Sequence, residues 1–206
     1  MLLAERIALL LLDPEEGRLA SIVNGYSNQL LFTTALLCDL TLSGHLVAEE
    51  GVLLHNSSMP VQQPLLVQLQ QALGSQSYLP TRLLKRSTQS LPGLSDKLLE
   101  GLARRDIVHR TPRLRWWPLT GYRYPLRSQR ALDEAEQILQ RSLHSAQGSA
   151  DMAMLILADA GGLLNRLSAR GHAQAYATLD RLDEASLNSE QAIPTLRLLR
   201  QALLDY

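Results

Sequence analysis

The chain lacks the features that mark disulfide-stabilised proteins, cysteine-based zinc proteins and membrane-spanning proteins. Its 206 residues include a single cysteine, Cys38, so neither a disulfide framework nor a cysteine-based zinc site can form within one chain. No apolar run approaches the ~18 residues that a membrane span requires. We therefore expect any contact with a membrane to be peripheral.

Motifs of the common enzyme classes are also missing. The sequence contains no phosphate-binding glycine motif, no HExxH and no nucleophile elbow. Its five histidines are scattered and not paired at metal-ligand spacing. No residue pair stands out as a nucleophile with its base. We therefore expect a protein without enzymatic activity, cofactor or bound metal.

Leucine dominates the composition, whereas phenylalanine occurs once. Because leucine favours helices over strands, the sequence predicts a mainly α fold. We expect a single globular helical domain over residues 1–206 with two β-hairpins, one of them a projecting basic and aromatic hairpin. Leucine periodicity and turn residues predict helices that begin near Leu3 and span Asn24–Leu42, Met59–Gly74, Thr81–Thr88, Met152–Leu167, Ala173–Ala185 and Ile193–Leu204.

The first residues, MLLAERIALLLLDPEEG, resemble a signal peptide only superficially. Glu5 and Arg6 interrupt the apolar run, and no small-residue cleavage site follows. We interpret this segment as the first core helix, ended by the turn at Asp13-Pro14. The expected location is the cytoplasm or the cytosolic face of a membrane.

The most informative stretch is SDKLLEGLARRDIVHRTPRLRWWPLTGYRYPL, residues 95–126. Its leucines predict a short helix, and Ile107-Val108 then predicts the start of a strand. Pro118 and Gly121 break a second strand that carries both tryptophans. We call residues 107–125 the arm. Residues 97–130 carry nine basic and two acidic residues, a balance of +7 in a chain of zero net charge: Lys97, Arg104, Arg105, Arg110, Arg113, Arg115, Arg123, Arg127 and Arg130 against Glu100 and Asp106.

Such an asymmetry predicts a negatively charged partner, either a lipid surface or a nucleic acid. A helix followed by a basic hairpin is also the arrangement of a winged-helix DNA-binding protein. Asp96 and Glu100 on the presumed recognition helix oppose a phosphate backbone, so nucleic acid is not the favoured partner. A third interpretation makes the arm a self-association element, which is compatible with lipid binding.

With these segments in view, the chain resembles the Golgi phosphoprotein 3 family over nearly its full length. The resemblance rests on AERIALLLLDPEEGRLAS, ALLCDLTLSGHLVAEEG, DKLLEGLARRDIVHR and LILADAGGLL. It implies a largely helical peripheral membrane protein of a family whose eukaryotic members bind phosphatidylinositol 4-phosphate on Golgi membranes. The resemblance also implies that the hairpin Arg110 to Tyr124 enters the bilayer or mediates self-association.

The resemblance places the lipid headgroup pocket of the family on mostly neutral residues of this chain. The family's tryptophan falls at Val23 or Asn24, and its arginines fall at Thr33, Pro92 and Ser95, with only Lys97 as a neighbouring basic position. Phosphoinositide recognition needs cations held around the phosphate. We therefore expect contact with anionic lipid without a conventional phosphoinositide pocket.

The expected lipid contacts are the five consecutive residues Arg113, Leu114, Arg115, Trp116 and Trp117. Full burial of Leu or of an aromatic side chain contributes about 1.5–3 kcal/mol, and each arginine near an anionic surface adds about 1 kcal/mol. Neither contribution alone holds a protein on a membrane after the cost of association. Together they predict weak, reversible and salt-sensitive binding.

Overall fold

Two helices that are apolar on nearly every side form the centre of the structure, α2 (Asn28–Leu42) and α7 (Ser149–Ala160). The computed structural model describes residues 1–22, 26–56, 60–112, 121–145, 148–183 and 191–206. The Ser27 hydroxyl accepts the amide of Leu30 at 3.1 Å and so caps α2, whose only phenylalanine, Phe32, is fully buried. Helices apolar all round belong in a core, which is the position both occupy.

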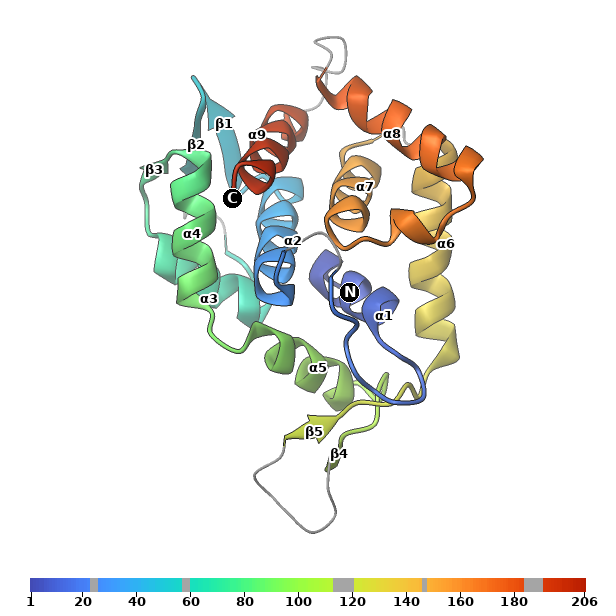
Figure 1. Cartoon of the computed structure of the whole chain (residues 1–206). Coiled ribbons are helices and arrows are strands. Elements are labelled where there is room, and N and C mark those ends of the chain that lie inside the picture. The colour runs from blue at the N-terminus through green and yellow to red at the C-terminus, as the bar shows by residue number, and fades with distance from the viewer. Residues whose placement is uncertain (23–25, 57–59, 113–120, 146–147, 184–190) are drawn as a thin grey trace.

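The remaining helices surround this pair (Figure 1). They are α1 (Leu3–Leu11), α3 (Pro64–Leu73), α4 (Pro80–Ser90), α5 (Leu94–Arg104), α6 (Gln129–Ser145), α8 (Ala169–Asp183) and α9 (Ala192–Leu204), with a short 3₁₀ turn at Leu164–Arg166. α1 has no exposed residue, whereas each of the others has a buried stripe and an exposed face.

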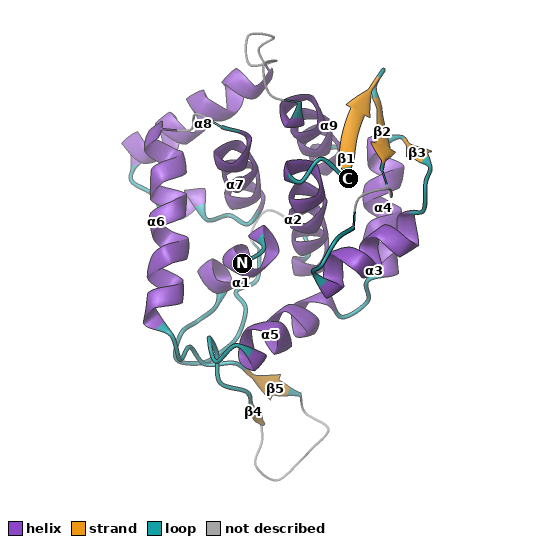
Figure 2. Ribbon diagram, turned by 180° about the vertical axis from the view of Figure 1, so that it is seen from behind, coloured by secondary structure: helices purple, strands orange, loops and turns teal. Residues whose placement is uncertain are grey.

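Two small antiparallel sheets lie on separate sides of the molecule (Figure 2). The first pairs β1 (Leu46–Glu49) with β2 (Val52–His55), and β2 with β3 (Ser77–Tyr78). The turn between β1 and β2 places Glu50 and Gly51 at positive φ, the geometry of a tight two-residue hairpin. The second sheet pairs β4 (Thr111–Pro112) with β5 (Tyr122–Arg123) at the base of the arm.

The predicted mainly α fold with two hairpins is confirmed, with three local corrections. The predicted strand at Ile107-Val108 is wrong, because Val108 makes only an isolated bridge to Leu126 and the strand begins at Thr111. The helix predicted to reach Leu167 ends at Ala160, since Gly161-Gly162 follows and Gly162 has φ +69°. The strand β3 was not predicted, as its two residues are too few to show a pattern.

A half-buried carboxylate joins the first helix to the central one. Both oxygens of Asp39, on α2, accept the amide of Leu3 at 3.0 and 3.1 Å and so satisfy the first turn of α1. Burial raises the pKa of Asp39 to about 7, although the amides of Leu3 and Ala4 and the charge of Arg6 act in the opposite direction. In the described part of the chain, no helix is both long enough and apolar enough to cross a bilayer.

Candidate functional site

The base of the arm is held by the loop that follows α1. The amide of Tyr124 donates to the carbonyl of Gly17 at 2.8 Å, and the amide of Leu126 donates to the carbonyl of Pro14 at 2.8 Å. An ion pair of 3.0 Å between Arg123 and Glu16 adds a side-chain contact. The loop thus lies along the second strand of the arm and fixes its direction.

Gly17 allows the close approach of these two segments. It has φ +64°, and a Cβ atom added there would lie 2.2 Å from the backbone nitrogen of Pro125 and 2.4 Å from the carbonyl carbon of Tyr124. Real Cβ atoms do not approach backbone atoms this closely. Only glycine fits this position without moving the arm.

Arg110 joins the two strands of the arm to α5. Its guanidinium carbon lies 3.6 Å from the centre of the Tyr122 ring, and a guanidinium nitrogen lies 3.6 Å from the carboxylate of Glu100. Tyr124 is buried, and burial raises the pKa of its hydroxyl, with the Glu100 charge adding to the rise and Arg110 opposing it. The two aromatic residues at the base of the arm therefore both take part in contacts within the protein: Tyr122 with Arg110, and Tyr124 by burial.

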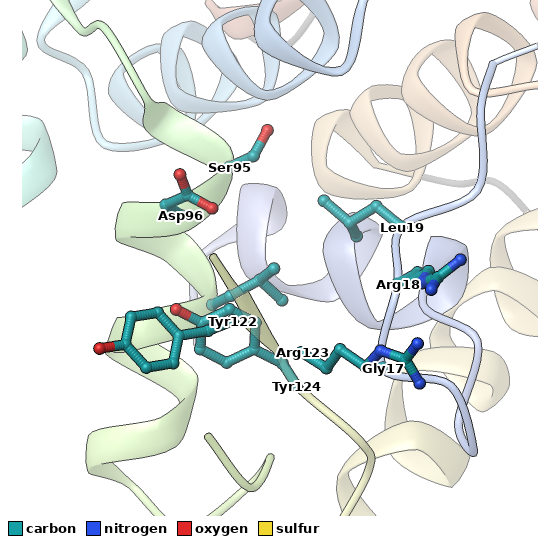
Figure 3. Close-up of a pocket in the computed structure, with 9 residues that line it drawn as sticks. Gly17, Arg18, Leu19, Ser95, Asp96, Tyr122, Arg123 and Tyr124 are labelled. Carbon is teal, nitrogen blue, oxygen red and sulfur yellow. The ribbon is translucent and has the colours of Figure 1, made fainter. Parts of the chain in front are cut away.

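A small pocket lies between α5, the loop after α1 and β5 (Figure 3). Its volume of about 200 Å³ is below the ~300–1,000 Å³ of sites for drug-sized ligands. Arg18 supplies a positive charge, whereas exposed Asp96 supplies a negative one and Arg123 is engaged by Glu16. The lining residues are Gly17, Arg18, Leu19, Ser95, Asp96, Leu99, Tyr122, Arg123 and Tyr124. Such a pocket fits a small polar group and does not concentrate positive charge for a phosphate.

Ion pairs reduce the positive charge that the sequence predicts around the arm. Of the seven basic residues in this region that the structure describes, five contact a carboxylate, and three of those carboxylates lie outside residues 97–130. Counting these three lowers the local balance from +7 to +4. The pairs are Arg105–Glu5, Arg110–Glu100, Arg123–Glu16, Arg127–Asp106 and Arg130–Glu134.

The residues predicted to contact lipid and the first predicted pocket residue lie outside the described residues. These are Arg113, Leu114, Arg115, Trp116 and Trp117 in the arm, and Asn24 before α2. Their prediction stays a prediction.

The other predicted pocket residues do not form one site. Thr33 is fully buried, and its hydroxyl donates to the Gln29 carbonyl at 2.8 Å, so it cannot touch a ligand from solvent. Ser95 lines the pocket beside the arm, whereas Pro92 is exposed and Lys97 half-buried. Neither Pro92 nor Lys97 lines that pocket.

Gln29 shows why the region around Thr33 and Pro92 is structural in this chain. Its amide nitrogen donates to the Leu91 carbonyl at 2.7 Å, and its amide oxygen accepts the Leu94 amide at 3.1 Å. One neutral side chain thus bonds on both sides of Pro92 and joins α2 to the link between α4 and α5. The group at this junction is a satisfied amide and not a cation.

Sequence reasoning missed the role of Gly17 and Arg18. A glycine directly after an acidic turn, in DPEEG, was the only signal, and it did not reveal which backbone would approach it. In the part of the chain that is described, no group of three or more His, Cys, Asp or Glu side chains could hold a metal ion.

Comparison with known proteins gives one finding. A family model described as Golgi phosphoprotein 3 (GPP34) matches residues 3–203, which is nearly the whole chain. A comparison with curated proteins finds no match.

Proposed function

The chain belongs to the Golgi phosphoprotein 3 family, and from this premise we propose that it is a peripheral membrane protein that contacts anionic lipid through the arm. It acts by binding and not by catalysis, on the cytosolic face of a membrane. The observation that carries the proposal is the construction of the arm. Backbone hydrogen bonds and ion pairs fix the base of the arm, which consists of the two strands β4 and β5. Residues 113–120, between these strands in the sequence, contain both tryptophans of the chain.

A fixed base supports lipid insertion because it limits the entropy lost on binding. Gly17, Arg110 and Tyr124 are ordered before any ligand arrives, so the cost of ordering falls mainly on the residues that contact lipid. Burying apolar side chains and bringing cations to an anionic surface then contribute the few kcal/mol expected from the sequence.

Attraction by charge is the recognition mode that the described residues favour. The positions that would hold a phosphoinositide headgroup are a buried threonine, a proline and a serine. Phosphatidylinositol 4-phosphate is therefore expected to bind no better than phosphatidylserine when the two are compared at equal vesicle surface charge. A clear preference for the phosphoinositide would contradict this part of the proposal.

Intrinsic fluorescence tests the contact directly, because Trp116 and Trp117 are the only tryptophans. We expect vesicles of phosphatidylcholine and phosphatidylserine to shift the emission to shorter wavelength, and added salt to reverse the shift. Trp116→Ala/Trp117→Ala should lose most of the co-sedimentation with these vesicles. Leu204→Ala/Tyr206→Ala, which removes two exposed apolar side chains near the end of the chain, is the matched control.

Three results would count against lipid insertion. Vesicles that leave the emission unchanged, while duplex DNA quenches it with a steep salt dependence, would favour the winged-helix alternative. Emission that is already short-wavelength in the protein alone, and moves to longer wavelength on dilution, would favour self-association through the arm. Co-sedimentation that survives loss of both tryptophans would place the contact elsewhere on the protein.

A further inference from the structure

Acidic residues are missing from one continuous part of the chain. The 45 residues from Gly51 to Ser95 contain no Asp or Glu, while they contain Arg82, Lys85 and Arg86. All twenty acidic residues of the protein lie outside this stretch. It forms β2, α3, β3 and α4, which lie beside one another in the fold (Figure 1). These three cations therefore have no acidic partner within this stretch of the chain.

The three cations lie on the exposed face of α4, which we call the α4 basic face (Arg82, Lys85 and Arg86). The opposite face buries Leu83 and Leu84 in the core. Arg86 is partly engaged, since its Nε donates to the Ala72 carbonyl at 3.0 Å and its guanidinium lies 5.8 Å from the Tyr78 ring centre. No ion pair involves Arg82 or Lys85 within the described ranges.

An ordinary solvated helix face mixes charges of both signs, and α6 of this protein does so. Arg130 pairs with Glu134 one turn later at 3.1 Å, and Asp133 and Glu136 lie close by in sequence. α4 has no acidic residue at any position, so none of its cations can form such a pair within the helix. The α4 basic face thus keeps its charge available to a partner, whereas five cations around the arm do not.

The position of α4 connects this face to the arm. α4, α5 and the strands β4 and β5 at the base of the arm follow one another along one edge of the molecule in Figures 1 and 2. Leu79, at the start of α4, is 50% exposed and supplies an apolar side chain beside the cations. Three cations are few against the 6–10 phosphate contacts of a typical DNA-binding protein, and an exposed leucine gains nothing from a phosphate backbone. A few cations beside an exposed apolar side chain suit a lipid surface.

We propose that the α4 basic face, with Leu79, is a second contact of this protein with an anionic membrane surface. The inference rests on the proposed function, because it adds a second point of attachment to that of the arm. The arm supplies apolar insertion, and α4 supplies a cluster of three exposed cations without an acidic residue on the same helix.

The test compares two pairs of neutralised cations. Arg82→Gln/Lys85→Gln removes two charges from α4, and Arg127→Gln/Arg130→Gln removes two charges that are ion-paired. With vesicles of phosphatidylcholine and phosphatidylserine, we expect the α4 variant to bind about 30-fold more weakly, from a factor of about five for each cation near an anionic surface. The control variant should lose less than about threefold. All four side chains are exposed, so melting temperatures should stay unchanged.

The outcomes separate this inference from the proposal for the arm. Equal losses in both variants would indicate a simple effect of net charge and would overturn the inference. An unchanged α4 variant, together with binding lost in Trp116→Ala/Trp117→Ala, would overturn the inference while the arm still binds. Loss in the α4 variant with none in the tryptophan variant would support α4 and overturn the arm. An α4 variant that loses duplex DNA binding and keeps vesicle binding would assign the face to nucleic acid and overturn the inference.

Discussion

Gly17→Ala should destabilise the protein far more than an ordinary glycine substitution at positive φ. A left-handed conformation costs an alanine about 1–2 kcal/mol. The added Cβ would also lie 2.2 Å from the Pro125 nitrogen, so the two backbones must separate. Forced packing costs about 1–3 kcal/mol, and loss of the Tyr124 to Gly17 hydrogen bond costs about 0.5–1.5 kcal/mol. The expected loss in free energy of unfolding is about 3–6 kcal/mol.

Gly44→Ala is the matched control for this substitution. Gly44 also has positive φ, at +74°, but a Cβ atom there would meet nothing within 4 Å. Its substitution should cost only the conformational ~1–2 kcal/mol. Urea unfolding monitored by circular dichroism gives the free energy of unfolding of both variants. The difference between them isolates the cost of the close approach between the loop and the arm.

The expected difference between the two variants is about 2–4 kcal/mol. If Gly17→Ala and Gly44→Ala destabilise the protein equally within about 0.5 kcal/mol, the packing of the loop against Tyr124 and Pro125 is not as described. The argument for a fixed base of the arm would then fail, since it depends on the close packing of Gly17 against the backbone of Tyr124 and Pro125.

Three further predictions concern the core. Burial raises the pKa of Asp39 from 3.8 to about 7, so the folded protein keeps a proton that the unfolded chain releases. The free energy of unfolding should therefore fall by about 3 kcal/mol as the pH rises from 4.5 to 7.5. In urea unfolding, Asp39→Asn should lack that part of the pH dependence, and an unchanged profile would contradict the assignment. Gln29→Ala should cost about 2–4 kcal/mol, because the Leu91 carbonyl and the Leu94 amide lose their partner. The control Gln89→Ala, at an exposed position, should cost under about 0.5 kcal/mol. Similar losses in the two variants would refute the bridging role of Gln29. Phe32→Ala should cost about 3–5 kcal/mol in the same assay through the cavity it leaves, and a smaller loss would mean that the core around α2 collapses to fill it.

Local patterns in the sequence were sufficient to predict most helices. Leu30, Leu36 and Leu40 are part of a run that is apolar all round, and this run is the buried helix α2. The hairpin of β1 and β2 consists of two short apolar runs on either side of Glu50-Gly51, a local pattern that is typical of a tight hairpin. In both cases the helix or hairpin is determined by residues close together in the sequence, through hydrophobic periodicity and turn-forming residues.

The candidate site was less predictable because its contacts join residues that are distant in sequence. Arg123 pairs with Glu16 across 107 positions, and Arg105 pairs with Glu5 across 100. A count of charges over residues 97–130 cannot include such partners. The sequence therefore predicted the position of the arm and overstated its positive charge.

Zero net charge is compatible with a partner of negative charge because a surface responds only to nearby charges. At physiological ionic strength, interactions between exposed charges are screened beyond about 8 Å. Residues 51–95 carry a formal charge of +3, which the other 161 residues balance with −3. A membrane facing α4 would lie near the first group and be screened from much of the second. The arrangement of charge along the chain, and not its total, decides which surface can bind.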